Sequence, residues 1–287
     1  MTDISIRISG RAGRITLTRP QALNAMTYDM CLAIEDAFDA WQHDPKVDLI
    51  ILDAEGDRAF CSGGDIAELY ATGTKGNYAY GRKFWADEYR LNAKIFAYTK
   101  PVVSFLLGCT MGGGVGIGCH GSHRVVGESS QIAMPECGIG LFPDVGATEF
   151  LVRAPGALGM YLGLTGARLK AADAILSGFA THFVPNNLLE ELAAGLAENV
   201  DEIDTYISSF AKDPGKAPLD EHRHLIDQHF SAGSVSDIIA GLDTEDGYWA
   251  IETADELRIK SPTSLSVTHR QLGMRACPEF DTVMRTE

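Results

Sequence analysis

Residues 134–146 carry two carboxylates in surroundings suited to acid–base chemistry. Glu136 and Asp144 lie in a largely apolar stretch that Pro and Gly residues interrupt. Burial among apolar side chains raises the pKa of a carboxyl group, which favours proton transfer or nucleophilic attack. Each acid also has a structural interpretation, because Asp144 could cap a helix over about residues 145–153 and Glu136 could be stabilised by a helix dipole. The residues alone leave both interpretations open.

Glu88 is a charged residue on an otherwise apolar helical face. Residues 77–99 predict an amphipathic helix in which Glu88 shares one face with Phe84, Leu91 and Ile95. The remaining charged residues of this helix fall on the other side. We therefore expect a buried Glu88, which is either a functional acid or a paired structural one.

Glycine is concentrated in residues 60–66 and 111–121, and each segment follows a predicted strand. Glycine lets a ligand approach bare backbone N–H groups. Two such groups from separate loops, converging on one carbonyl oxygen, would form an oxyanion hole. Close packing of a helix against a sheet is the alternative for Gly116 and Gly118. Residues 116–121 match G-x-G-x-x-G, but they end a predicted helix instead of opening one, which excludes a dinucleotide-binding fingerprint.

Other catalytic and metal-binding motifs are missing from the sequence. No G-x-S-x-G elbow is present, which disfavours an α/β-hydrolase. His222, His224 and His229 have no accompanying ligand motif, so we interpret them as a solvated helix face and expect no metal site. His120 and His123 flank the second glycine segment, and the sequence assigns neither of them a role.

The elements that must position these residues alternate between strands and helices. Residues 3–8 and 13–18 alternate apolar and polar side chains and predict a hairpin. Thr27 is expected to cap a helix that runs to about residue 43. Further strands are expected at 47–53, 101–107 and 124–126, and further helices at 77–99 and 112–120. This alternation predicts an α/β fold with parallel strand pairing.

Beyond about residue 170 the sequence favours helices. They are predicted at residues 188–210, 220–230, 245–260 and 263–272. We therefore divide the chain into a core of residues 1–190 and a helical C-terminal region of residues 191–287.

The overall composition excludes several classes of protein. A net charge of −15, from 24 Lys and Arg against 39 Asp and Glu, is opposite to that of a nucleic-acid binder. No apolar run is long enough to span a membrane, and the first residues resemble neither a signal peptide nor a transit peptide. The six cysteines contain no C-x-x-C pair, as expected of reduced thiols. The expected compartment is the cytoplasm, with no membrane or nucleic-acid partner.

Four segments, in this order along the chain, resemble the crotonase (enoyl-CoA hydratase/isomerase) superfamily: residues 17–25, 59–66, 111–114 and 134–136. Within it, further segments are most similar to the 3-hydroxyisobutyryl-CoA hydrolase branch: residues 111–117, 120–126, 138–146, 260–265 and 268–272. The resemblance covers essentially the whole chain. It implies a spiral of ββα units followed by a helical C-terminal region.

The resemblance also implies roles for individual residues. It places the backbone N–H groups of Gly64 and Gly113 in an oxyanion hole, and the carbonyl of Ser62 near the adenine of CoA. Contact with the substrate falls on three acids: Glu88, Glu136 and Asp144.

The implied activity is hydrolysis of the thioester of 3-hydroxyisobutyryl-CoA, or of a similar short 3-hydroxyacyl-CoA, in valine breakdown. Glu136 would attack the carbonyl or activate water, and Asp144 would orient the substrate hydroxyl or the water. CoA is part of this substrate, so no separate cofactor is expected. The resemblance also implies a homo-oligomer, a trimer or a hexamer. Members of the branch usually continue past the point at which this sequence stops, which leaves the contribution of that segment open.

Three alternatives remain. Hydratases of the superfamily use a second glutamate that would fall at Gly116, so a hydratase would lack half of its acid pair. Some dienoyl-CoA isomerases carry an aspartate at the position of Asp144, so isomerisation of an enoyl-CoA or dienoyl-CoA is the main enzymatic alternative. A catalytically silent acyl-CoA binder is the non-enzymatic one, and the retained acids disfavour it.

Overall fold

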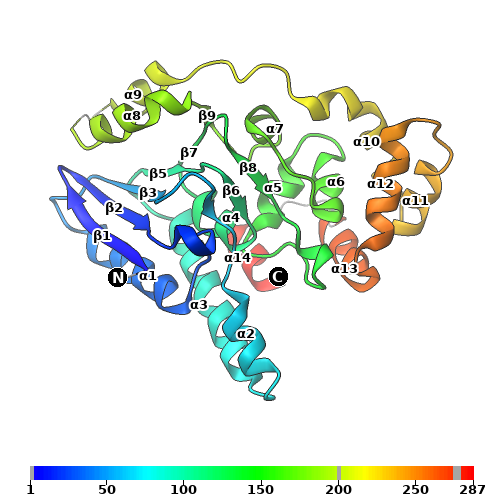
Figure 1. The fold of residues 1–287 in the computed structure, drawn as a ribbon, viewed down its shortest axis with the longest axis horizontal. Helices are drawn as coiled ribbons and strands as arrows, with labels where there is room; N and C mark the ends of the chain where they lie inside the picture. Colours follow the sequence, from blue (N-terminus) through cyan, green and yellow to red (C-terminus); the bar gives the residue numbers. More distant parts are fainter. Residues whose placement is uncertain (1–2, 199–201, 274–278) are drawn as a thin grey trace.

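A six-stranded sheet organises the first part of the computed structural model, which describes residues 3–198, 202–273 and 279–287 (Figure 1). Its strands, in spatial order, are β1 (Ile4–Ser9), β2 (Ala12–Leu17), β3 (Leu49–Ala54), β5 (Val102–Phe105), β7 (His123–Val126) and β9 (His182–Phe183). The β1–β2 hairpin is antiparallel and every later pair is parallel. The predicted hairpin, the α/β class and the parallel pairing are therefore confirmed.

A second, three-stranded parallel sheet lies beside the first, and the sequence patterns do not predict it. It consists of β4 (Ala59–Cys61), β6 (Cys109–Met111) and β8 (Gln131–Ala133). Strands of three residues are too short to show a hydrophobic period. Each glycine turn follows a predicted strand as expected, and β4 and β6 lie between that strand and the turn.

Helices connect the strands and cover the sheets. The N-terminal ones are α1 (Tyr28–Gln42), α2 (Ile66–Gly73), α3 (Tyr78–Phe96) and α4 (Gly113–Gly118), with a 3₁₀ turn at Pro20–Ala22. Thr27 caps α1 as predicted, since its hydroxyl accepts the N–H of Met30 at 3.2 Å. Helix α2 projects from the body of the molecule (Figure 1).

The middle of the chain contributes short helices. These are α5 (Ala147–Arg153), α6 (Leu158–Thr165) and α7 (Ala171–Leu176), with 3₁₀ turns at Glu136–Gly138 and Asn186–Leu188. The helix predicted over residues 145–153 therefore begins two residues later than expected, and Asp144 is not its cap.

The C-terminal region is helical, as predicted, but more finely divided. It contains α8 (Leu189–Leu196), α9 (Ile203–Phe210), a 3₁₀ turn at Pro218–His222, α10 (Arg223–His229), α11 (Val235–Leu242), α12 (Tyr248–Ile259), α13 (Pro262–Leu272) and α14 (Phe280–Thr286). The helix predicted over residues 188–210 is two helices, and part of their junction lies outside the described residues. Helices α11 and α14 are additions to the predicted set. The domain boundary at residue 190 stays a prediction.

These C-terminal helices cover different parts of the molecule. Helices α8 and α9 share a hydrophobic cluster with one face of the large sheet. Helices α10, α12 and α13 contact α6, whereas α14 lies against α3 and α5 (Figure 1). No helix in the described ranges combines the length and the apolar character needed to cross a membrane.

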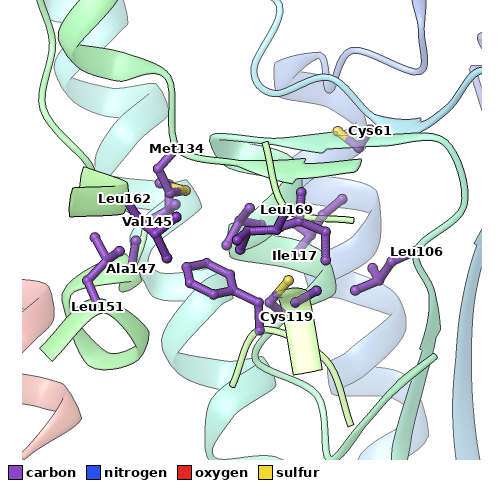
Figure 2. Packing of buried hydrophobic residues seen from close by; sticks show 14 of the residues in the cluster. Cys61, Leu106, Ile117, Cys119, Met134, Val145, Ala147, Leu151, Leu162 and Leu169 are labelled. Carbon is purple, nitrogen blue, oxygen red and sulfur yellow. The ribbon is translucent and has the colours of Figure 1, made fainter. Parts of the chain in front are cut away.

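The main hydrophobic core anchors the segment that carries Asp144. Val145 and Ala147 are fully buried members of this core. Figure 2 shows both of them beside Met134 and Leu162. The backbone that follows Asp144 is therefore held by apolar packing.

Candidate active site

A cavity of about 330 Å³ brings together all the predicted site residues. Its lining includes Ser62, Gly64, Glu88, Gly113, Glu136 and Asp144. These residues come from the turn after β4, from α3, from the start of α4 and from the segment between β8 and α5. A cavity of about 660 Å³ beside α6 and α12 is larger, but none of the six lines it.

The two glycine turns lie next to each other at one wall of this cavity. A Cβ atom at Gly113 would lie 3.2 Å from the backbone nitrogen of Gly64. Gly63, with φ of +110°, and Gly112, with φ of +52°, supply the turns in the left-handed region that favours glycine. Gly113 is the first residue of α4, where backbone N–H groups lack an acceptor within the helix. The two turns thus present the neighbouring backbone amides of Gly64 and Gly113 at this wall, where glycine provides no side chain to cover them.

Glu88 enters the cavity from α3 and lies against the second glycine turn. Its side chain is buried, with an exposed fraction of 2%, and a Cβ atom at Gly113 would approach its Oε1 to 2.5 Å. Burial, and secondly the charge of Asp144, raise the pKa of Glu88 to about 8. No described residue forms a hydrogen bond with its Oε1. The predicted burial of Glu88 is confirmed, and the paired structural acid is not what the structure shows.

Glu136 lies at the start of the 3₁₀ turn after β8, with 5% of its surface exposed. Its Oε1 is close to Gly112, where a Cβ atom would approach it to 2.7 Å. Its Oε2 has no hydrogen-bond partner among the described residues. Burial first, and the charge of Asp144 second, raise the pKa of Glu136 well above its usual value.

Asp144 is held by a tyrosine of α3. The hydroxyl of Tyr89 donates a hydrogen bond to its Oδ2 at 2.7 Å. Burial raises the pKa of Asp144 to about 6, and the bond from Tyr89 lowers it in part. Gly146, and not Asp144, is the N-cap of α5. The carboxylate is thus directed toward the cavity and α3, and the capping interpretation is wrong.

The cavity gathers acidic side chains. Among the described residues, its lining contains Glu88, Glu136, Asp144 and Asp65, and neither lysine nor arginine. Neighbouring carboxyl groups in a low-dielectric site titrate in sequence, because each charge opposes the next. With a pKa of about 6 against about 8, Asp144 ionises before Glu88 as the pH rises.

Gly116 has no room for the second acid of a hydratase. A Cβ atom there would lie 2.8 Å from both the amide nitrogen of Asn92 and the Cβ of Val145. Asn92 is completely buried. Gly116 is therefore closely packed, but against α3 and the Asp144 turn and not against a sheet as predicted.

Sequence reasoning missed four residues that hold the Asp144 segment: Tyr89, His120, Gln271 and Glu287. Tyr89 is beside Glu88 on the face already identified, which was an available signal. The other three act through the backbone over distances of 25 residues or more along the chain, and no local pattern reveals such contacts.

The histidine cluster is only partly a solvated face. His229 is buried and its Nε2 lies 2.9 Å from Oε1 of Glu245, while His222 stacks on Trp249. His224 is exposed. The prediction of a solvated face is therefore wrong for His222 and His229. Helix α10 packs against α11, and Trp249 of α12 reaches the 3₁₀ turn that carries His222.

Comparisons with known proteins agree with this geometry. The profile of the family described as enoyl-CoA hydratase/isomerase matches residues 12–287. A protein of Danio rerio named "3-hydroxyisobutyryl-CoA hydrolase, mitochondrial" is 42% identical, over 97% of this chain and 75% of its own length.

Two solved structures share the fold over 99% of this chain. One, described as a carnitinyl-CoA dehydratase from Mycobacterium thermoresistibile, is 41% identical, with a TM-score of 0.94 over 83% of its length. The other, described as an enoyl-CoA hydratase from Rhodobacter sphaeroides 2.4.1, is 47% identical, with a TM-score of 0.91 over 82% of its length. The predicted crotonase-like fold is confirmed.

Proposed function

The chain belongs to the enoyl-CoA hydratase/isomerase family, and we propose that it hydrolyses the thioester of 3-hydroxyisobutyryl-CoA, or of a similar short 3-hydroxyacyl-CoA, in valine catabolism. One observation carries this proposal. Two glycine turns, Glu136 and Asp144 line one cavity, while close packing at Gly116 leaves no place for the second acid of a hydratase.

The glycine turns supply the electrostatic part of the mechanism. The N–H groups of Gly64 and Gly113 would donate to the thioester oxygen as it becomes an oxyanion. Such preorganised donors stabilise the transition state because they need no reorientation when the charge develops. The carbonyl of Ser62, which leads into the first turn, would then lie on the side where the adenine of CoA binds.

Glu136 would perform the covalent or general-base step. Glu136 would react as its carboxylate, and Asp144 in the same cavity would hold the proton that Glu136 releases. Glu136 then attacks the acyl carbon, the C–S bond breaks, and the CoA thiolate takes up the proton. Water hydrolyses the resulting anhydride to the 3-hydroxy acid and restores Glu136. In the general-base route, Glu136 instead removes a proton from water that attacks the thioester directly.

The remaining acids would orient the reactants. Asp144, fixed by Tyr89, would bind the substrate hydroxyl or the attacking water. Glu88, against the second glycine turn, would support this network as a neutral donor, since its raised pKa keeps it protonated near neutral pH.

Release of free thiol from a panel of acyl-CoA esters tests the proposal. We expect turnover of short 3-hydroxyacyl-CoA esters and little turnover of the corresponding esters without the hydroxyl. If none of the esters releases free thiol, the hydrolase assignment is contradicted. Single-turnover hydrolysis in ¹⁸O-water then tests the anhydride route. Label in the Glu136 side chain requires the anhydride, whereas label in the product alone arises in the general-base route and also when water attacks the acyl carbonyl of the anhydride.

Isomerisation is the second candidate, because Glu136 and Asp144 line the same cavity and could move a proton between two carbons of an enoyl-CoA or dienoyl-CoA. A change in diene absorbance without thiol release would support it. Binding of acyl-CoA esters with neither signal would instead favour a silent binder.

Assembly and compartment stay predictions. A trimer or hexamer is proposed by resemblance, and light scattering coupled to size-exclusion chromatography checks it. A cytoplasmic location is likewise proposed, although the Danio rerio relative is named as mitochondrial. Cell fractionation distinguishes the two compartments.

A further inference from the structure

We infer that Glu287, directly after α14, is a positioning residue that holds the Asp144 turn in its reactive geometry. This inference rests on the proposed hydrolase function, since it concerns the reach of Asp144 toward the substrate. Glu287 does not line the cavity, so it would act through the backbone of residues 144–148.

The carboxylate of Glu287 caps α5. Its Oε2 accepts the N–H of Gly146 at 2.6 Å, and its Oε1 accepts both the N–H of Thr148 at 3.1 Å and the Thr148 hydroxyl at 2.6 Å. The first N–H groups of a helix have no acceptor within it. Gly146, the N-cap, has no side chain to supply one. A residue from the far end of the sequence therefore supplies the cap.

The turn needs such support because its backbone is strained. Val145 has φ of +55° and Gly146 has φ of +80°. A β-branched residue rarely adopts the left-handed region, and such a conformation persists only where the surroundings enforce it. The side chain of Val145 is buried in the core beside Met134 (Figure 2). Packing alone fixes this side chain but leaves the neighbouring peptide groups to be oriented by hydrogen bonds.

Two further contacts fix the peptide groups around Asp144. His120 bonds through its Nε2 to the carbonyl of Val145 at 2.7 Å. Gln271, on α13, donates to the carbonyl of Pro143 at 2.9 Å and to the Thr148 hydroxyl at 2.5 Å. The carbonyls on both sides of Asp144 are thus bonded to distant residues. Glu287 closes this arrangement, because it shares the Thr148 hydroxyl with Gln271.

The test compares Glu287→Gln with Asp281→Asn, an exposed acid on α14, in the full chain. Gln keeps the size of Glu287 but has one acceptor oxygen, so its NH₂ group faces a donor. We expect kcat of Glu287→Gln to fall about 10- to 100-fold with KM within about threefold, since small misplacements of a reacting group have effects of this size. Asp281→Asn should retain the wild-type kcat.

A double mutant separates positioning from general stability. If Glu287 acts through Asp144, adding Glu287→Gln to Asp144→Asn should lower kcat no further than about twofold. A full additional loss in that background, or a kcat of Glu287→Gln within about twofold of wild type, overturns the inference. If the wild-type protein releases no thiol, the hydrolase proposal itself is overturned, and this result is distinct from the two outcomes that overturn the role of Glu287.

Thr148→Val covers the case in which Glu287→Gln does not fold. It removes the hydroxyl shared by Glu287 and Gln271 and leaves the backbone N–H bond in place. We expect kcat to fall about threefold to tenfold, an effect of the size of losing one ordinary hydrogen bond. An unchanged kcat in this variant also overturns the inference.

Discussion

The two sides of the cavity are built in different ways. The proposed oxyanion side consists of backbone amides that follow β4 and β6, held by parallel strand pairing and by glycine. The acid side consists of buried carboxyl groups, and the turn that carries one of them, Asp144, is held by side chains of α3, of α13 and of Glu287. Backbone pairing between strands thus positions the donors, whereas a carboxyl group with a perturbed pKa requires burial and side-chain contacts from several helical segments.

Replacing the proposed nucleophile should give the largest effect on the acid side. Glu136→Gln should lower kcat about 10³- to 10⁴-fold, because an amide neither attacks the thioester nor accepts a proton. Its thermal stability should not fall, since a neutral group replaces a buried acid. Glu190→Gln, at an exposed position on α8, is the control in the thiol-release assay. A Glu136→Gln enzyme with more than a tenth of wild-type kcat contradicts this role.

Adding a methyl group should disturb the oxyanion side. Gly113→Ala should lower kcat about 10²- to 10³-fold, comparable to loss of one oxyanion donor, because its Cβ would lie 2.5 Å from Oε1 of Glu88. Gly247→Ala is the matched control, as a Cβ atom there meets nothing within 4 Å. Equal kcat values for the two variants, measured by steady-state kinetics, would show that the turn tolerates displacement.

The buried acids should make stability depend on pH. The folded-state pKa of Glu88 is raised to about 8 from 4.5, so folding favours its neutral form. Stability is therefore complete below the unfolded-state pKa and decreases as pH rises toward 8. Between pH 5 and pH 8 we expect Glu88 to account for a loss of about 3.5 kcal/mol in the free energy of unfolding, at about 1.4 kcal/mol for each pKa unit.

Urea unfolding of wild type and Glu88→Gln at these two pH values measures this loss. The variant should show a flatter dependence, although Glu136 contributes in the same direction. Identical pH dependence in both proteins would mean that Glu88 titrates normally.

The smallest effect concerns the hydrogen bond that links α3 to the Asp144 turn. Tyr89→Phe removes the bond to Oδ2, so the pKa of Asp144 should rise and kcat should fall about tenfold. The acidic limb of the kcat/KM profile should accordingly move to higher pH. Tyr70→Phe, at an exposed tyrosine of α2, should leave this profile unchanged. If the kcat/KM profile of Tyr89→Phe against pH coincides with that of wild type, Tyr89 does not influence the reaction.

Much of the fold was predictable because its signals are local. Residues close together in the sequence predict three features: the hairpin, the capped helix after Thr27 and the helix face that carries Glu88. Strands β4, β6 and β8 were not predictable, since three residues cannot display a period. The apparent cap at Asp144 was wrong because the strained Val145 delays the start of α5, and this strain depends on core packing.

The sequence by itself determined which residues could do chemistry: two glycine segments and three acids in apolar surroundings. Residue type and short-range spacing were sufficient for that, whereas only the family resemblance identified Gly116 as the position where a hydratase needs a glutamate. Tertiary structure decided how these groups function together. The order of their pKa values, the bond from Tyr89 to Asp144 and the cap from Glu287 all depend on burial and on contacts between distant segments. The physical reason is that desolvation and hydrogen-bond geometry arise only when the chain is packed.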